Sequence, residues 1–264
     1  NIWIGTFNGL NRYNKSTGLF QNHTANDIQS DGLTHSSIWC IVKDNQGTLW
    51  LGTYFGGVNY FNPEYEIYTR YKVGDTEKEG LSSPIVGRMT EDKDGNLWIC
   101  TEGGGVNVYN RKNNTYRWYR HEEGKNSISH NNVKAIYYDR TEEIMWIGTH
   151  LGGLNKLDLH TNRFTVYRMK AGDPATLPSD IVRDIVPYGD KLIIATQNGV
   201  CLFNPATGTC EHLFKDTKEG RNIGMVASLY IDKDETLWVS ATGEGVYSYR
   251  FDTGKLTHYA HNPS

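Results

Sequence analysis

The sequence predicts an all-β protein, a β-propeller built from four-stranded blades. One observation is a repeat: the motif W-I-G-T, followed by G-[LV]-N, returns along the 264 residues every 45 to 48 positions. Such a fixed period is typical of radial or solenoid arrays. A second observation is that no stretch shows a sustained 3.6-residue apolar period, while β-branched and aromatic residues dominate the apolar runs. The copies begin at Trp3, Trp50, Trp98, Trp146, Ile193 and Trp238.

The second copy shows the four strands of one blade in order. Residues 37–42 are apolar and β-branched, and they end at the turn composition of residues 44–47. Residues 48–54 and 58–61 form the second and third β-rich runs, and residues 66–71 form an alternating fourth run. Four short strands with tight turns in about 45 residues match a propeller blade.

The repeat divides the chain into one partial and five complete blades. We expect the partial blade to lack its first strand, because the chain begins at the second-strand motif. Seven blades would need about 330 residues, so we expect the chain to be part of a longer, seven-bladed or double seven-bladed array. The predicted bounds are 1–32 for the partial blade and 33–80, 81–126, 127–175, 176–220 and 221–264 for the complete blades.

The third copy carries the fullest form of the repeat. It begins with Leu81–Ser83, continues with D-K-D-G-N-L-W over Asp92–Trp98, and ends with G-G-V-N-V-Y-N over Gly104–Asn110. These residues resemble the two-component regulator propeller repeat. Five copies match that pattern well, and the resemblance covers essentially the whole chain. The copy at Ile193 departs from it because it lacks both the Trp and the Asp.

That resemblance implies a periplasmic sensor region of a Bacteroides-type hybrid two-component system, with no enzymatic activity and no cofactor of its own. In similar proteins, two seven-bladed propellers precede a β-sandwich domain, a membrane span and a histidine kinase with a DNA-binding output. Their typical ligands are oligosaccharides released from glycans. The resemblance therefore implies an oligosaccharide ligand and control of glycan-utilisation transcription. It also implies a homodimer formed through the parent sensor, and attachment to the inner membrane only through that parent.

Charge and cysteine content narrow the function classes further. The formal net charge of −3 argues against nucleic-acid binding, which demands a basic surface, and no apolar run has membrane-spanning length. The cysteines lack the spacing of a metal site, so we predict none. Cys40 and Cys100 are interpreted as buried free thiols. Cys201 and Cys210 flank one hairpin, and they could pair in an oxidising compartment. Their register looks offset, however, so free thiols are the alternative.

Residues that recur in every blade are expected to serve the architecture. The anchor tryptophans are interpreted as packing between blades, since large aromatic side chains dominate burial. The glycines after the second strand permit a positive φ or a close backbone approach, and Thr-Gly turns such as residues 14–18 supply hairpin chemistry. Function is therefore sought where equivalent positions differ.

Aligning the first strands places variable residues between apolar neighbours. One column contains Trp39, Gly87, Lys134, Arg183 and Ala227, and the next contains Cys40, Arg88, Ala135, Asp184 and Ser228. The first strand of a blade lines the central channel, and alternate side chains face opposite sides. The loop between the second and third strands also varies, and we expect it on the same face as the loop that leads into the next blade. The predicted ligand-binding residues are Trp39, Tyr54, Phe55, Arg88, Lys134, His150, Arg183 and Asp184.

These residue types suit a sugar ligand. Sugars stack on aromatic rings and meet a few placed polar groups in a preformed concavity, and Trp39, Tyr54 and Phe55 would supply the rings. An Arg side chain can also hold a carboxylate or sulfate bidentately. Alternatively, these residues have structural roles only. Trp39 would then fill the mouth of the channel, and Arg88 would form an ion pair with Asp184 or a neighbouring glutamate. Lys134 and Arg183 would be solvated cations.

Two other functions fit the same fold. Enzymes of the streptogramin-lyase type have a similar blade, with a His base and a magnesium ion on the central face, and His35, His130 and His150 could lie on the ligand face. A His base needs an orienting partner and a substrate proton within hydrogen-bond reach. The remaining alternative is a protein-interaction scaffold, because propellers offer rigid faces to partners.

Overall fold

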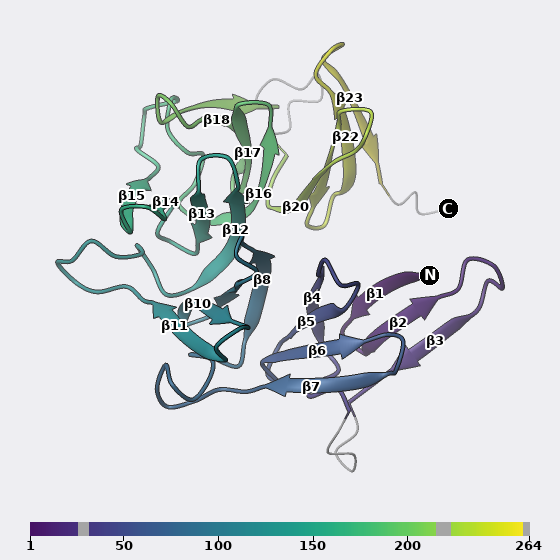
Figure 1. Ribbon diagram of the computed structural model, residues 1–264. Helices are drawn as coiled ribbons and strands as arrows, with labels where there is room; N and C mark the ends of the chain where they lie inside the picture. Colours follow the sequence, from purple (N-terminus) through teal and green to yellow (C-terminus); the bar gives the residue numbers. More distant parts are fainter. Residues whose placement is uncertain (26–31, 215–222, 261–264) are drawn as a thin grey trace. The chain divides into compact units, whose positions relative to one another are not determined.

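A computed structural model of the chain describes residues 1–25, 32–214 and 223–260 (Figure 1). The regular secondary structure of these residues consists of β-strands alone. The strands form six sheets, of which five have four strands and one has three. Strands that follow one another in the chain pair within each sheet. The predicted all-β fold with four-stranded blades is confirmed. The chain comprises two compact units, Asn1–Val133 and Lys134–Ser264.

The first unit contains three sheets. The three-stranded sheet consists of β1 (Ile2–Thr6), β2 (Gly9–Tyr13) and β3 (Phe20–His23). The second sheet consists of β4 (Ile38–Lys43), β5 (Leu49–Thr53), β6 (Val58–Asn62) and β7 (Ile67–Tyr71). The third consists of β8 (Val86–Glu91), β9 (Leu97–Thr101), β10 (Gly105–Asn110) and β11 (Thr115–Tyr119). In the second sheet, the strand ends differ from those predicted by one residue at most.

The second unit contains the remaining three sheets, all of four strands. The fourth sheet consists of β12 (Val133–Asp139), β13 (Ile144–Thr149), β14 (Leu154–Asp158) and β15 (Arg163–Tyr167). The fifth consists of β16 (Val182–Tyr188), β17 (Lys191–Thr196), β18 (Gly199–Asn204) and β19 (Thr209–Leu213). The sixth consists of β20 (Val226–Ile231), β21 (Thr236–Ala241), β22 (Gly245–Arg250) and β23 (Lys255–Tyr259). The predicted blade boundary between residues 220 and 221 lies outside the described residues. A larger array of seven blades stays a prediction.

The anchor tryptophans pack between neighbouring sheets of a unit. Trp50 of β5 meets Tyr109 of β10 edge-on, with ring centroids 6.2 Å apart. In the second unit Trp146 of β13 meets Phe203 of β18 in the same way at 5.5 Å. Trp50 and Trp146 are almost completely buried. The interpretation of these two side chains as packing between blades is confirmed.

The small residue of the W-I-G-T motif lets the next sheet approach closely. A Cβ added at Gly52 would lie 2.7 Å from Val86 Cγ1, and a Cβ added at Gly148 would lie 2.5 Å from Val182 Cγ1. Both distances are too short for carbon atoms that are not bonded to each other. The first strand of the following blade therefore packs directly against this glycine, which explains why the position stays small.

A buried aspartate links the turn after the first strand to the anchor tryptophan. Asp92 Oδ1 accepts hydrogen bonds from the backbone N–H groups of Asp94 and Asn96, at 3.0 and 2.9 Å. Its Oδ2 accepts one from Trp98 Nε1 at 2.9 Å. The same arrangement joins Asp44 to Trp50 and Asp232 to Trp238. We call it the Asp–Trp clamp, and it gives the D-x-x-G-x-L-W pattern a physical cause.

A second recurring contact holds the loop that leads into each blade. Thr34 N donates to Asn59 Oδ1 at 3.0 Å, and Asn59 Nδ2 donates back to Thr34 Oγ1 at 2.6 Å. Asn107 and Ser82 repeat this pair of bonds at 2.8 and 2.7 Å. The Asn of the G-[LV]-N motif thus fastens the lead-in loop of its own blade to the third strand.

Replacing Asp92 with Ala should destabilise the chain by about 3 kcal/mol, because a buried indole N–H and two turn amides lose a charged acceptor. The measurement is the free energy of unfolding from urea denaturation. Asp190 is the matched control, since it is exposed in the blade that has no anchor Trp, and Asp190→Ala should change stability by less than about 0.5 kcal/mol. Equal effects of the two substitutions would contradict the clamp.

Acidification should weaken the first unit through His23. Its Nε2 is buried with no hydrogen-bond partner among the described residues, and its pKa is lowered mainly by burial, with Arg12 adding to the effect and Glu66 opposing it. The unfolded chain therefore takes up the proton first, so stability is lost as the pH falls below about 6.5, the pKa of an unperturbed His.

Urea denaturation at pH 7.5 and pH 5.0 measures this loss. The loss should be smaller in His23→Gln, which cannot titrate. An identical loss in the wild type and the variant would show that His23 does not contribute.

Candidate ligand-binding surface

A β-bulge interrupts the first strand of the blade wherever its register with the second strand is defined. In the second sheet Ile38 pairs with Thr53 and Cys40 with Gly52, so Trp39 is the inserted residue. The same irregularity lies between Val86 and Met89, between Val182 and Asp184, and between Val226 and Ser228. Bulges redirect side chains and are frequent next to functional sites. The first variable column predicted from the sequence supplies the inserted residues Trp39, Arg183 and Ala227, and the second column follows them directly.

The loop between the second and third strands lies beside the loop that leads into the following blade, as predicted. In the first unit Gly9 N donates to Ser36 O at 2.7 Å, and Gly57 N donates to Pro84 O at 3.0 Å. In the second unit Gly153 N donates to Asp180 O at 2.8 Å. Bulge residues and both kinds of loop therefore share one end of the sheets.

Four rings form a continuous aromatic surface at this end of the second sheet. Trp39 and Tyr54 stack nearly parallel, with centroids 5.0 Å apart and planes 12° apart. Phe55 meets Tyr54 edge-on at 4.4 Å and lies 6.2 Å from the ring of His35. Trp39 is 45% exposed and Phe55 is 54% exposed. We call His35, Trp39, Tyr54 and Phe55 the aromatic platform.

Hydrogen bonds to Ser37 and a tight loop at Gly56 hold the aromatic platform in place. Trp39 Nε1 donates to Ser37 Oγ at 3.2 Å, and the backbone N–H of Tyr54 donates to Ser37 O at 3.1 Å. Gly56 follows Phe55 in the same loop, and a Cβ there would collide with the side chain of Thr34. The buried Ser37 thus holds the Trp39 ring and the backbone of Tyr54, and the tight approach at Gly56 limits movement of the loop. The platform is a preformed surface.

Two predicted histidines accept hydrogen bonds through Nδ1. Ser37 N donates to His35 Nδ1, and Asn132 N donates to His130 Nδ1, both at 3.0 Å. At the equivalent turns Ser83 Oγ and Ser179 Oγ accept from Ile85 N and Ile181 N. His35 and His130 therefore replace a turn-forming hydroxyl. In the neutral ring the proton must then lie on Nε2, which leaves no basic nitrogen free on either side chain.

Arg88 occupies the bulge of β8, opposite Cys100 in the neighbouring strand. Burial raises the pKa of the Cys100 thiol well above its usual range, and the Arg88 guanidinium partly offsets that rise. The cation therefore lies near the buried thiol and is itself half-buried. Its predicted contact with a ligand stays a prediction, as does the alternative ion pair with Asp184.

Arg183 and Gln197 form a polar pair in the second unit. Arg183 lies in the bulge of β16, and its Nε and Nη2 donate to Gln197 Oε1 at 3.1 and 2.6 Å. Gln197 lies in the loop between β17 and β18, so the pair joins a bulge residue to a loop residue. The amide aligns the guanidinium without neutralising it, which keeps a positive charge at this end of the sheet.

Asp184 has a structural role that the sequence did not indicate. Its side chain is buried, Oδ1 accepts from Ile185 N at 3.0 Å, and Oδ2 accepts from Leu229 N at 2.9 Å. The carboxylate therefore connects β16 to β20 of the next sheet. A ligand contact by Asp184 stays a prediction, but these bonds already account for the residue.

The other two predicted residues are half-buried at the same end of their blade. Lys134 is the second residue of β12, and His150 follows the end of β13. Next to His150, Leu151 has a φ of 73° and a side chain that is 56% exposed. A bulky residue in the left-handed region is uncommon and marks a locally strained loop.

Three residues of this surface were missed as individual candidates. Phe7 is 82% exposed in the turn between β1 and β2, the loop equivalent to that of Tyr54 and Phe55. Gln197 and Leu151 also lie in that variable loop, in other blades. The signal was the loop itself, which the sequence comparison had marked as variable, rather than any motif around the three residues.

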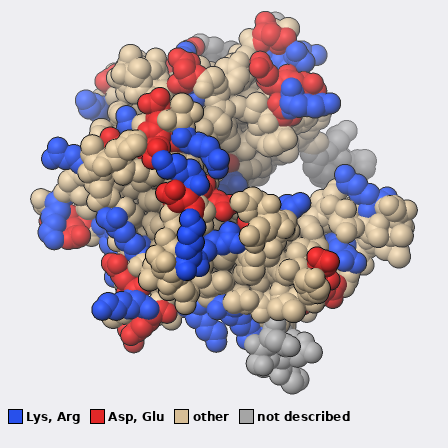
Figure 2. Space-filling view, in the orientation of Figure 1, with Lys and Arg blue, Asp and Glu red and all other residues tan. Residues whose placement is uncertain are grey.

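On the face shown in Figure 2, acidic and basic side chains are interspersed, and neither sign forms a continuous field. Among the described residues, no three His, Cys, Asp or Glu side chains lie close enough together to hold a metal ion. Recognition at the bulge residues would therefore depend on individual side chains.

A sequence model of the family described as the two component regulator propeller matches residues 32–55 and 80–103. The chain carries two-component regulator propeller repeats. Each match covers a lead-in loop, the bulged first strand, the turn after it and the second strand with its following loop. No curated protein sequence matches the chain.

Several solved structures share the fold. The extracellular domain of a protein described as the hybrid two component system BT3049 from B. thetaiotaomicron superposes with a TM-score of 0.70 at 23% identity, over 83% of this chain and 29% of that one. The corresponding domain of BT4673 from the same organism gives 0.63 at 22% identity, over 98% and 42%. The chain thus spans less than half the length of these relatives.

A propeller enzyme is similar in fold as well. Virginiamycin B lyase from Staphylococcus aureus, in a structure with quinupristin, superposes with a TM-score of 0.65 at 13% identity, over 92% of this chain and 74% of that one. In the described part of this chain, no helix is long and apolar enough to cross a membrane.

The proton positions on the histidines can be measured directly. Two-dimensional ¹⁵N–¹H spectra of the imidazole nitrogens at pH 7.5 should show His35 and His130 protonated on Nε2. His121 is the matched control: its Nδ1 lies 2.8 Å from Ile128 O, a carbonyl that can only accept, so it should be protonated on Nδ1. A proton on Nδ1 of His35 or His130 would contradict the assigned hydrogen bonds.

Proposed function

We propose that the chain is part of the extracellular sensor of a hybrid two-component system and that it binds an oligosaccharide on the aromatic platform. The observation that carries this proposal is the exposed, stacked pair of Trp39 and Tyr54 at a bulge, extended by Phe55. Exposed rings are costly to keep in water, and a fixed stack of them suits the apolar face of a sugar ring.

The geometry of the platform supports binding with little rearrangement. Ser37 holds the Trp39 ring and the Tyr54 backbone through hydrogen bonds, and the Tyr54 ring stacks on Trp39, so few rotamers must be frozen when a ligand arrives. Ordering flexible side chains is one of the main costs of association, and preorganisation removes it. The edge-on Phe55 and His35 rings add a wall next to the stack, which favours a chain of sugar rings over one isolated ring.

Arg183 supports recognition of an acidic or hydroxyl group in the second unit. Gln197 uses the Nε and Nη2 donors of Arg183, and a guanidinium carries five donors in all. The remaining donors suit a uronic carboxylate or a sulfate. The same proposal assigns polar contacts to Arg88, Lys134 and His150 in their blades.

The proposal extends to the parent protein through the structural relatives. Extracellular domains of two hybrid two-component systems share the fold, which supports a periplasmic sensor anchored in the inner membrane by its parent histidine kinase. Such a sensor would act as a homodimer and control genes for glycan use. Ligand can shift it only by binding one arrangement more tightly than another, and a rigid, well-packed blade would pass the change to domain contacts.

Trp39→Ala should weaken oligosaccharide binding about tenfold, a loss of roughly 1.4 kcal/mol, without unfolding the chain. Arg183→Ala should weaken binding of a uronic or sulfated ligand more than that of a neutral one. Isothermal titration calorimetry gives the dissociation constants, and circular dichroism checks the fold. Tyr65→Ala is the matched control, because Tyr65 is also an exposed aromatic but lies in the turn between β6 and β7, at the opposite end of the sheet.

Unchanged affinity in both folded variants would place the ligand elsewhere. Equal weakening by Tyr65→Ala would also contradict the platform. If no oligosaccharide binds and a defined protein partner is captured instead, the chain is a protein-interaction scaffold.

The fold shared with virginiamycin B lyase favours one alternative, a lyase with His150 as base. His150 is the candidate base because it lies in the loop between β13 and β14, at the end of its blade that carries the variable residues. A lyase would turn over macrocyclic esters or acidic glycans, and His150→Ala or a chelator would abolish that turnover. We expect flat progress curves with both substrate classes for the wild-type chain, and sustained turnover that His150→Ala removes would overturn the sensor proposal.

A further inference from the structure

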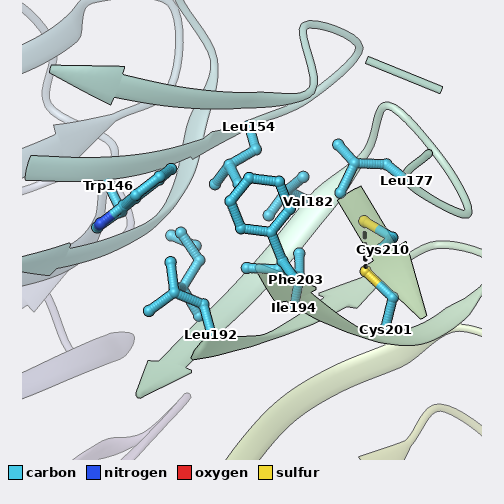
Figure 3. Close-up of a cluster of buried hydrophobic side chains, with 11 residues drawn as sticks. Trp146, Leu154, Leu177, Val182, Leu192, Ile194, Cys201, Phe203 and Cys210 are labelled. Atoms are coloured by element: carbon cyan, nitrogen blue, oxygen red, sulfur yellow. Dashed lines mark hydrogen bonds between the residues drawn. The ribbon is translucent and has the colours of Figure 1, made fainter. Parts of the chain in front are cut away.

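Two buried cysteines face each other in the second unit. Cys201 of β18 and Cys210 of β19 are both buried and both carry free thiols. The Cys201 thiol donates to the Cys210 sulfur, with the sulfur atoms 3.3 Å apart. Figure 3 shows this contact at the edge of a cluster that also contains Phe203 and Leu177. The other two cysteines belong to the first unit.

The strand register explains how the two side chains meet. Cys201 pairs with His212, and Cys210 pairs with Phe203, so the cysteines are diagonal neighbours across two antiparallel strands. Residues two apart on a strand share a face, and diagonal neighbours on one face are within reach of each other. A disulfide needs the sulfur atoms about 2.05 Å apart, so closure requires a movement of only about 1.3 Å.

We propose that Cys201 and Cys210 form an intramolecular disulfide when the chain folds in the presence of a thiol-oxidising disulfide. One thiolate attacks the disulfide of the oxidant, which is oxidised glutathione or an oxidoreductase, and expels one thiolate. The second cysteine then attacks the mixed disulfide, the Cys201–Cys210 bond forms, and the second oxidant thiolate leaves. Two protons and two electrons pass from the cysteines to the oxidant, which ends as two thiols.

Burial of the two thiols determines the stage of folding at which they can react. Burial raises the pKa of the Cys201 thiol well above its usual range, and the contact with Cys210 adds to the rise. The thiolate is the reactive form, so the folded pair is unreactive as well as inaccessible. Oxidation must therefore precede completion of the native packing.

The segment before β16 closes over the outer strand. Cys210 N donates to Ala175 O at 2.8 Å, and His212 Nε2 donates to Thr176 O at 2.6 Å. These bonds cover the free edge of β19, and once they have formed they help to shield the two thiols from an oxidant. The disulfide would tie β19, the outermost strand of its sheet, to β18 and close a loop of ten residues.

The direct test counts thiols in the full wild-type chain. One sample is folded with oxidised and reduced glutathione and another with a reductant, and both are then denatured in excess alkylating agent. Intact mass should show two alkylated cysteines, Cys40 and Cys100, in the first sample and four in the second. Peptide mapping should find Cys201 joined to Cys210. Four alkylated cysteines in both samples, or a bridge that contains Cys40 or Cys100, would overturn the proposal.

Two further measurements use the same protein. The oxidised chain should melt roughly 5 °C above the reduced chain, because a bridge constrains the unfolded state.

The rate of bridge formation tests the role of burial. When oxidised glutathione is added to folded, reduced chain, the bridge should form at least tenfold more slowly than when the chain refolds in oxidised glutathione. Equal rates would contradict the role of burial. Cys210→Ala is the control, with three alkylated cysteines under either condition.

Discussion

The Asp–Trp clamp is the interaction on which the regularity of this chain depends. In three blades one carboxylate, buried at Asp44 and Asp92 and half-buried at Asp232, accepts hydrogen bonds from the turn after the first strand and from the indole N–H of the second. A buried carboxylate with three or four donors gains more from folding than a neutral pair would, so turn and Trp are fixed together. The blade at Ile193 has lost both residues, and it joins β16 to β17 by the short turn around Gly189. The blade of Trp146, by contrast, keeps the Trp but has Arg140 at the position of the aspartate.

The fixed turn also determines where variation is tolerated. The clamp sets the register between the first and second strands at the turn that joins them. The small residue of the W-I-G-T motif lets the first strand of the next blade pack against the second strand. The bulge near the other end takes up one extra residue in each defined first strand. Because that residue has no partner opposite it, its side chain can be Trp39, Arg183 or Ala227 without disturbing the sheet. Architecture and recognition thus occupy different parts of the same strand.

The period, the strand ends and the shared end of the loops followed from the sequence, because a two-residue alternation and turn-forming residues have local signatures. The bulges did not, since an inserted residue in a variable column looks like any other variable residue. The structural role of Asp184 was missed for a related reason: its partner Leu229 N is 45 residues away and donates from the backbone, which carries no residue signal. The offset register of Cys201 and Cys210 was recognised, but only the diagonal geometry shows that it brings the sulfur atoms together.

Ligand binding is measured most directly by a thermal-shift screen of the full chain against neutral, uronic and sulfated oligosaccharides. A ligand that binds only the folded state adds about 2.7 kcal/mol of stability at a hundredfold excess over its Kd. The sensor proposal predicts a higher Tm with at least one of these classes. A well-folded chain whose Tm does not change with any of them would contradict it.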